Sequence, residues 1–139
     1  PGDEYAQFGY EMMRQWLHQD WHATGCTALL AQNDVMAAGV IKALQESNID
    51  VPHDVSVVGF DGVAGSGEDG INDAYLVPMR LSTAKVPLFD IGVTSMKVLL
   101  SETDQKPVPG KPLKLPVKLV TGESSARCLA RSYDTAGVS

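Results

Sequence analysis

Between residues 27 and 61, the pattern of apolar and polar positions changes from a continuous apolar run to helical spacing and back to an apolar run. An apolar run over residues 28–31 ends at a polar pair, and a second run over residues 55–58 is followed by Gly59, Phe60 and Asp61. Between the runs, apolar residues return with helical spacing, namely Val35, Met36, Val40, Ile41, Ala43 and Leu44. Short apolar runs around such a helix are typical of a βαβ unit in a parallel sheet. We therefore predict an α/β fold with both strands buried.

The polar residues that follow the two strands are the first candidates for chemistry. Ligands of open parallel sheets bind beyond the carboxyl ends of the strands, so we expect Asn33 and Asp61 to face one pocket. One residue of the pair Asn33 and Asp34 should cap the helix, and we assign that role to Asp34 and ligand contact to Asn33. An amide donates and accepts hydrogen bonds, and a carboxylate can accept from two vicinal hydroxyls. The alternative role for Asp61 is capping of the glycine-rich loop that follows.

Further elements are predicted on both sides of this unit. Residues 5–18 read as an amphipathic helix with a core-facing stripe of Tyr5, Phe8, Met12 and Trp16, beside Met13 and Leu17. Residues 79–83 read as a short strand and residues 88–100 as a helix. Residues 115–120 form a last strand, and Pro116 indicates that it lies at the edge of the sheet.

Two motifs in this stretch carry a family resemblance. Residues 31–37 read AQNDVMA and residues 51–61 read VPHDVSVVGFD, and the similarity continues through residues 2–3, 81–92 and 121–126. Together they resemble the effector domain of the lactose/galactose-repressor (LacI/GalR) family of bacterial transcription regulators, and the related periplasmic sugar-binding proteins. The resemblance covers most of the chain.

The resemblance implies a particular fold. It is an α/β, parallel-sheet Rossmann-like lobe of a type I periplasmic-binding-protein fold, incomplete because the second lobe is largely missing. Residues 1–84 would belong to the C-terminal lobe, residues 85–112 to the crossover and a helix of the other lobe, residues 113–131 to the return strand, and residues 132–139 to a tail. Family members are longer, so a DNA-binding headpiece and most of the first lobe are expected upstream.

The same resemblance adds expectations for the site. The family residue that matches Asn33 hydrogen-bonds effector hydroxyls, and a ring near the start of the first helix often stacks on the effector. This chain has Glu4 where that aromatic often stands, with Tyr5 next, and we expect either to reach a ligand; the alternative is that both face solvent. The family also implies a homodimer, with a seam along Val35, Ala38 and Lys42. The alternative role for Gly39, within that helix, is packing on its own sheet.

Composition limits the other functions. The formal net charge is −6 and the basic residues are scattered, which argues against a nucleic-acid surface within these residues. No run of 18 apolar residues exists that would span a membrane. Cys26 and Cys128 are expected to be unpaired thiols of a cytoplasmic protein rather than a disulfide.

Two motifs that suggest cofactors are rejected. Residues 65–70 match the GxGxxG spacing, but they do not follow a strand directly, and Glu68 and Asp69 would repel a pyrophosphate. His18, His22 and Cys26 are spaced by four, but Gly25 breaks the helix and a fourth ligand is not evident. We therefore expect no cofactor and no metal.

The sequence therefore predicts an effector-sensing domain of a transcription regulator. We expect its effector to be a small molecule and first of all a carbohydrate, although a free sugar, a sugar phosphate and a purine all remain open. Operator DNA would be contacted only through the upstream headpiece. The alternatives are the periplasmic sugar-binding protein of a transporter and an enzyme. The enzyme is disfavoured because no nucleophile and base, and no acid partner for Asp61, have credible spacing.

Overall fold

A computed structural model of the chain describes residues 2–63, 79–103 and 112–128. Its elements are α1 (Gly2–His18), the 3-10 helix η1 (Trp21–Thr24), β1 (Ala28–Leu30), α2 (Asp34–Glu46), β2 (Ser56–Asp61), β3 (Ser82–Lys85), α3 (Leu88–Thr103) and β4 (Lys118–Val120). The strand, helix and strand predicted over residues 27–61 are confirmed. The strand expected at residues 79–83 lies slightly later in the chain, as β3. The segments at residues 65–70 and 132–139 lie outside the described residues.

The strands form one sheet in the order β1-β2-β3-β4. β1 and β2 are parallel, with Leu30 opposite Val58, and β2 and β3 are parallel, with Asp61 opposite Lys85. β4 pairs antiparallel with β3 and lies at the edge, as Pro116 predicted. The α/β class and the parallel pairing of the first two strands are therefore confirmed.

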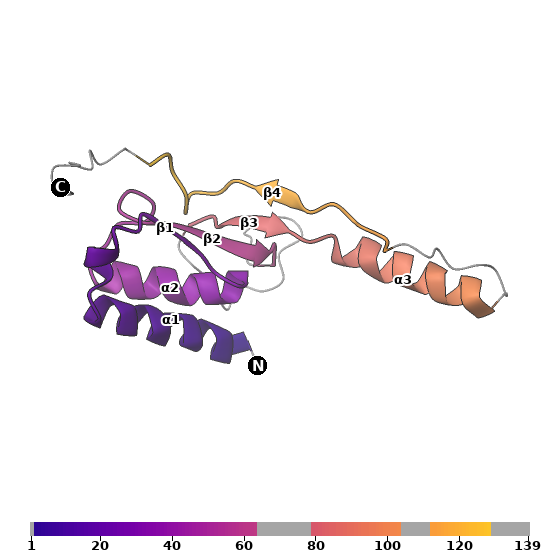
Figure 1. The fold of residues 1–139 in the computed structure, drawn as a ribbon, viewed down its shortest axis with the longest axis horizontal. Helices are drawn as coiled ribbons and strands as arrows, with labels where there is room; N and C mark the ends of the chain where they lie inside the picture. The colour runs from indigo at the N-terminus through magenta and orange to yellow at the C-terminus, as the bar shows by residue number, and fades with distance from the viewer. Residues whose placement is uncertain (1, 64–78, 104–111, 129–139) are drawn as a thin grey trace, which may run out of the picture.

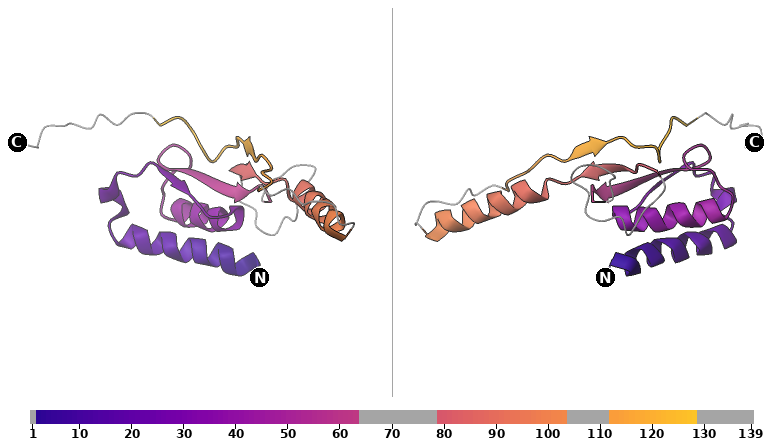
Figure 2. Two further views of the ribbon diagram at one scale, coloured as in Figure 1. Left: turned by 45° about the vertical axis from the view of Figure 1, so that its right-hand side comes forward. Right: turned by 180° about the vertical axis from the view of Figure 1, so that it is seen from behind.

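The two first helices lie on the same side of the sheet (Figures 1 and 2). α2 packs on the sheet and α1 packs on α2. The two helices touch through glycines: a Cβ on Gly39 would meet the backbone of Ala6 and Tyr10, and a Cβ on Gly9 would meet that of Met36. Gly39 therefore packs against α1, and not against the sheet as its alternative role supposed.

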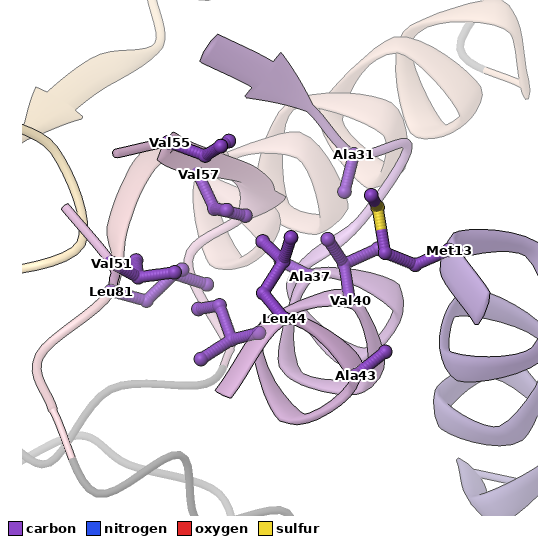
Figure 3. Packing of buried hydrophobic residues seen from close by; sticks show 11 residues of the cluster. Met13, Ala31, Ala37, Val40, Ala43, Leu44, Val51, Val55, Val57 and Leu81 are labelled. Carbon is purple, nitrogen blue, oxygen red and sulfur yellow. The ribbon is translucent and has the colours of Figure 1, made fainter. Parts of the chain in front are cut away.

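The core lies between α2 and the strands. Figure 3 shows Val40 and Leu44 of α2 directed at Val55 and Val57, with Met13 of α1 closing one side. The remaining buried apolar residues are Ala31, Ala37, Ile41, Ala43, Val51 and Leu81. The helical spacing read from the sequence of α2 therefore marked the buried face correctly.

The predicted core-facing stripe of α1 is wrong. Tyr5, Phe8 and Trp16 are exposed, whereas Met13 is fully buried. The reason is the close approach of α1 to α2, which requires small residues at the contact and so turns Gly9 inward. The large rings are left on the outer side of the helix, where the rings of Trp16 and Trp21 stack with centroids 6.1 Å apart.

Burial of β1 on both faces was also predicted wrongly. Leu30 is 74% exposed and Ala28 is exposed as well. α1 and α2 cover one face of the sheet, and none of the described helices covers the other (Figure 1). The apolar side chains of that face therefore meet solvent in this structure.

The closing segment of the chain is attached to the sheet by buried hydroxyls. The Ser82 amide donates to Oγ of Ser124 at 2.8 Å, and that hydroxyl donates to the Val57 carbonyl at 2.6 Å. The hydroxyls of Ser82 and Ser125 are 2.7 Å apart. The serine hydroxyls of the TGESSA segment therefore attach the end of the chain to β2 and β3.

α3 stands apart from the rest of the described structure. It extends away from the end of the sheet, beyond β3 (Figure 1). Its large apolar residues Leu88, Phe89, Met96 and Leu99 are exposed. None of the described helices is long and apolar enough to cross a membrane.

Candidate functional site

The carboxyl edge of the sheet carries both of the main candidate residues. Leu30 of β1 lies opposite Val58 of β2. Asn33 comes three residues after Leu30, and Asp61 comes three residues after Val58. The two strands run parallel, so both residues leave the sheet at one edge. The structure therefore brings the ends that carry Asn33 and Asp61 together, as their positions in the sequence indicated.

Asn33, and not Asp34, caps α2. The Met36 amide donates to Oδ1 of Asn33 at 2.8 Å, and Asn33 has the extended backbone of an N-cap residue. The assignment of the cap to Asp34 was therefore wrong. The Nδ2 group of this half-buried amide makes no hydrogen bond within the described part of the chain.

Asp61 has an unusual backbone conformation. Its φ is 101°, and Gly62 follows with φ 74°. A non-glycine residue rarely adopts positive φ, and such outliers gather at functional sites. The Asp61 carboxylate is half-buried and has no hydrogen-bond or ion-pair partner among residues 2–63, 79–103 and 112–128. The Asp61 carboxylate, oriented by this strained turn, can accept hydrogen bonds from a ligand.

Asp34 is fully buried and structural in a way that sequence reasoning missed. Its Oδ1 accepts from Oγ1 of Thr83 at 2.5 Å, and its Oδ2 accepts from the Val63 amide at 2.7 Å. A buried carboxylate needs such partners because desolvation of an unpaired charge costs several kcal/mol. Its early position in α2 was the only signal in the sequence, and that signal also fits a cap.

Glu4 and Tyr5 lie within the first turns of α1, and not at a junction before it. That end of α1 lies on the side toward which β2 and β3 point (Figures 1 and 2). Both side chains are exposed, Tyr5 by 52%. They lie on the same side as the carboxyl edge of the sheet, without a contact to Asn33 or Asp61 among the described interactions.

Two hollows lie away from these residues. A groove of about 480 Å³ runs along α3 and is lined by Ile91, Thr94, Ser95, Val98, Leu99, Leu113 and Leu115. A hollow of about 260 Å³ at the opposite edge of the sheet includes Trp21, His22, Cys26 and Asp54. The four candidate residues line neither of these two hollows.

The cysteines of the described residues form no disulfide. Cys26 is an exposed free thiol, and Sγ of Cys128 lies 3.6 Å from Oγ1 of Thr27. Among residues 2–63, 79–103 and 112–128, no three His, Cys, Asp or Glu side chains are grouped to hold a metal ion.

Comparison with known proteins identifies the family. The model of the periplasmic binding protein-like domain matches residues 2–125. The chain belongs to this family. The structure of the lac repressor dimer bound to operator and the anti-inducer ONPF has a TM-score of 0.70 and 33% identity, over 88% of this chain and 38% of that one. A LacI family transcriptional regulator from Arthrobacter sp. FB24, in complex with lactose, has a TM-score of 0.69 and 31% identity, over 87% of this chain and 42% of that one.

Curated relatives of this periplasmic-binding-protein-like chain are transcription regulators by name. The repressor MelR of Bacillus subtilis is 31% identical over 94% of this chain and 34% of its own length. The repressor PurR of Salmonella paratyphi B is 32% identical over 95% of this chain and 36% of its own length. The chain therefore spans about a third of the length of these relatives.

Proposed function

We propose that this chain is the effector-sensing part of a DNA-binding transcription regulator. The observation that carries the proposal is the carboxyl edge of the sheet, where parallel strands deliver Asn33 and Asp61 together. Asn33 brings an amide donor, and Asp61 brings a carboxylate that has no partner in the described part of the chain, on a backbone with positive φ. The names of the relatives support a regulator rather than a transport protein or an enzyme. As with such regulators, we place the protein in the cytoplasm.

The effector we propose is a small carbohydrate. Neighbouring sugar hydroxyls present a donor and an acceptor together, which the Asp61 carboxylate and the Asn33 amide complement. Tyr5 would offer an apolar ring face for stacking, and Glu4 a second acceptor. The complex of a related regulator with lactose supports this class of ligand.

The second wall of the cleft would come from the rest of the full-length protein. In this proposal, residues 85–112 cross to the other lobe and α3 packs there, while residues 113–131 return. Effector held between two lobes would favour the closed arrangement, and by linkage it would change operator affinity only as far as its own affinity differs between states. Operator DNA would be contacted by a headpiece outside these residues.

A homodimer is part of the proposal. The seam would run along Val35, Ala38 and Lys42 of α2, where the first two are half-buried and Lys42 is exposed. Tyr10 adjoins this seam, since Nζ of Lys42 lies 5.5 Å from its ring centroid. Structural neighbours described as dimers support a dimer as the oligomeric state.

The test is calorimetry on the full-length protein with lactose and ribose, and with hypoxanthine as a purine probe. Asn33→Asp keeps the cap oxygen and removes the amide donor, and Asp61→Asn keeps a side chain that tolerates positive φ. Each should weaken sugar binding by about 1–3 kcal/mol, the cost of orphaning a polar partner.

Asp54→Asn is the matched control, because Asp54 lies at the opposite edge of the sheet and should leave affinity unchanged. Unchanged affinity in both site variants would remove Asn33 and Asp61 from the site. If hypoxanthine binds and neither sugar does, the effector is a purine and not a carbohydrate. The isolated chain should bind these probes weakly, since it supplies one wall only.

A further inference from the structure

We propose that Asp34 is a positioning residue that holds the turn of residues 61–63 and thereby orients the Asp61 carboxylate. The inference deepens the proposed effector site and rests on it for its functional consequence. It comes from a buried titratable group that the site chemistry does not use.

The two oxygens of the Asp34 carboxylate accept hydrogen bonds from two different parts of the chain. Oδ2 accepts from the Val63 amide at 2.7 Å, directly after β2, and Oδ1 accepts from the Thr83 hydroxyl of β3. Asp34 itself is in the first turn of α2, next to the cap residue Asn33. A single side chain with no exposed surface therefore connects the helix, the turn and the neighbouring strand.

The turn needs such support because its backbone is strained. Asp61 has a φ of 101°, which strains a residue with a side chain, and Gly62 follows with a φ of 74°, which glycine adopts freely. On the strand side, the Val86 amide donates to the Asp61 carbonyl at 3.1 Å. On the other side, the Val63 amide donates to Asp34. Strained residues persist where their surroundings over-determine them, and these two bonds bracket Asp61.

Glycines on both sides make room for this arrangement. A Cβ on Gly59 would meet Oδ1 of Asp34, so the absence of a side chain there leaves space for the carboxylate. A Cβ on Gly62 would lie 2.7 Å from Cγ of Lys85, so the turn packs tightly on β3. The two glycines of the sequence GFDG, at positions 59 and 62, therefore leave room for the Asp34 carboxylate and for the turn.

The first measurement is hydrogen exchange of the Val63 amide in the full-length protein, followed by mass spectrometry. Asp34→Ala should speed exchange at Val63 by about tenfold or more, because its buried acceptor is lost. Asp34→Asn should restore protection: its carbonyl can accept from Val63, while its NH₂ group faces a Thr83 hydroxyl that can accept as well as donate.

Thr83→Val is the matched control. It removes the bond to Oδ1 but leaves the bond between Val63 and Oδ2, so it should lower stability without changing exchange at Val63. If Asp34→Ala does not fold, Asp34→Ser takes its place, because one short hydroxyl cannot reach both partners.

The second measurement is affinity for lactose and ribose in the same variants. Asp34→Ala should weaken binding by about tenfold or more, whereas Asp34→Asn and Thr83→Val should stay within about threefold of wild type. A purely structural role would lower stability in all three without this split. Unchanged exchange at Val63, or faster exchange with unchanged affinity, overturns the proposal. If wild type binds neither sugar, the carbohydrate assignment fails, and exchange still decides whether Asp34 holds the turn.

Discussion

α2 and α3 have similar apolar patterns, but most apolar side chains of α2 are buried and most of those of α3 are exposed. α2 packs its apolar stripe between the sheet and α1, and Leu44 has no exposed surface. α3 also carries apolar residues at helical spacing, yet Phe89 is 81% exposed and Leu99 is 54% exposed. Figure 1 shows the cause, because α2 lies under the sheet and α3 extends beyond it.

The difference shows that periodicity identifies a helix and its apolar side, but not what covers that side. Exposed apolar residues in a contiguous set mark a surface that another element or chain covers. The groove between α3 and residues 113–115 belongs to this surface. It supports the proposal that residues 85–112 belong with a second lobe.

The largest effect is expected from truncating matched leucines. Leu44→Ala should lower the free energy of unfolding of the isolated chain by about 2–5 kcal/mol, because it leaves a cavity in a packed core. Leu99→Ala should change it by less than about 0.5 kcal/mol, since Leu99 is mostly solvated. Urea unfolding measures both. Equal losses would show that α3 is packed in solution, and a larger loss for Leu99→Ala in the full-length protein would support docking on a second lobe.

Next comes the hydroxyl network of the closing segment. Ser124→Ala should cost about 1–3 kcal/mol for each group left without its partner, because the Ser82 amide and the Val57 carbonyl both bond to this hydroxyl. Ser95→Ala on exposed α3 is the control and should stay within about 0.5 kcal/mol. Thermal unfolding followed by circular dichroism measures both changes. A neutral Ser124→Ala would mean that water replaces the hydroxyl.

Glycines offer a third comparison. Gly39→Ala should destabilise by about 1–3 kcal/mol, since the added Cβ would meet the α1 backbone. Gly92 has nothing within 4 Å of such a Cβ, so Gly92→Ala should stabilise α3 by up to about 1 kcal/mol through helix propensity. Urea unfolding and helical ellipticity report the two changes. Opposite signs support the contrast, and a shared sign contradicts it.

The smallest effect is expected from pH. The Arg80 amide donates to the Glu123 carboxylate, and this bond, with the Arg80 guanidinium nearby, holds the pKa of Glu123 below its usual value. A lowered folded-state pKa gives stability that is present above the unfolded pKa and is lost as pH falls through the folded pKa. Glu123→Gln should therefore flatten the acid side of the stability profile slightly. Unfolding between about pH 3 and pH 6 measures it, and superimposable profiles would contradict it.

The placement of the two main candidate residues could be predicted because strand ends are visible in the sequence. Asn33 and Asp61 each follow an apolar run, and parallel pairing then brings those ends to one edge. The division of roles between Asn33 and Asp34 could not be predicted, because both side chains can cap a helix. Only the position of Thr83 and Val63 in space shows that Asp34 turns inward.

The sequence by itself determined the α/β class, the order of the elements and the residues at the strand ends, because these depend on local periodicity and turn chemistry. The tertiary structure decided which helix faces are buried. α1 turned Gly9 toward α2 and left the rings of Tyr5, Phe8 and Trp16 exposed, since backbones approach closely only where side chains are small. It also decided that Asp34 is buried, because its partners Val63 and Thr83 lie far from it in the sequence. Local patterns cannot encode a partner that only chain folding brings near.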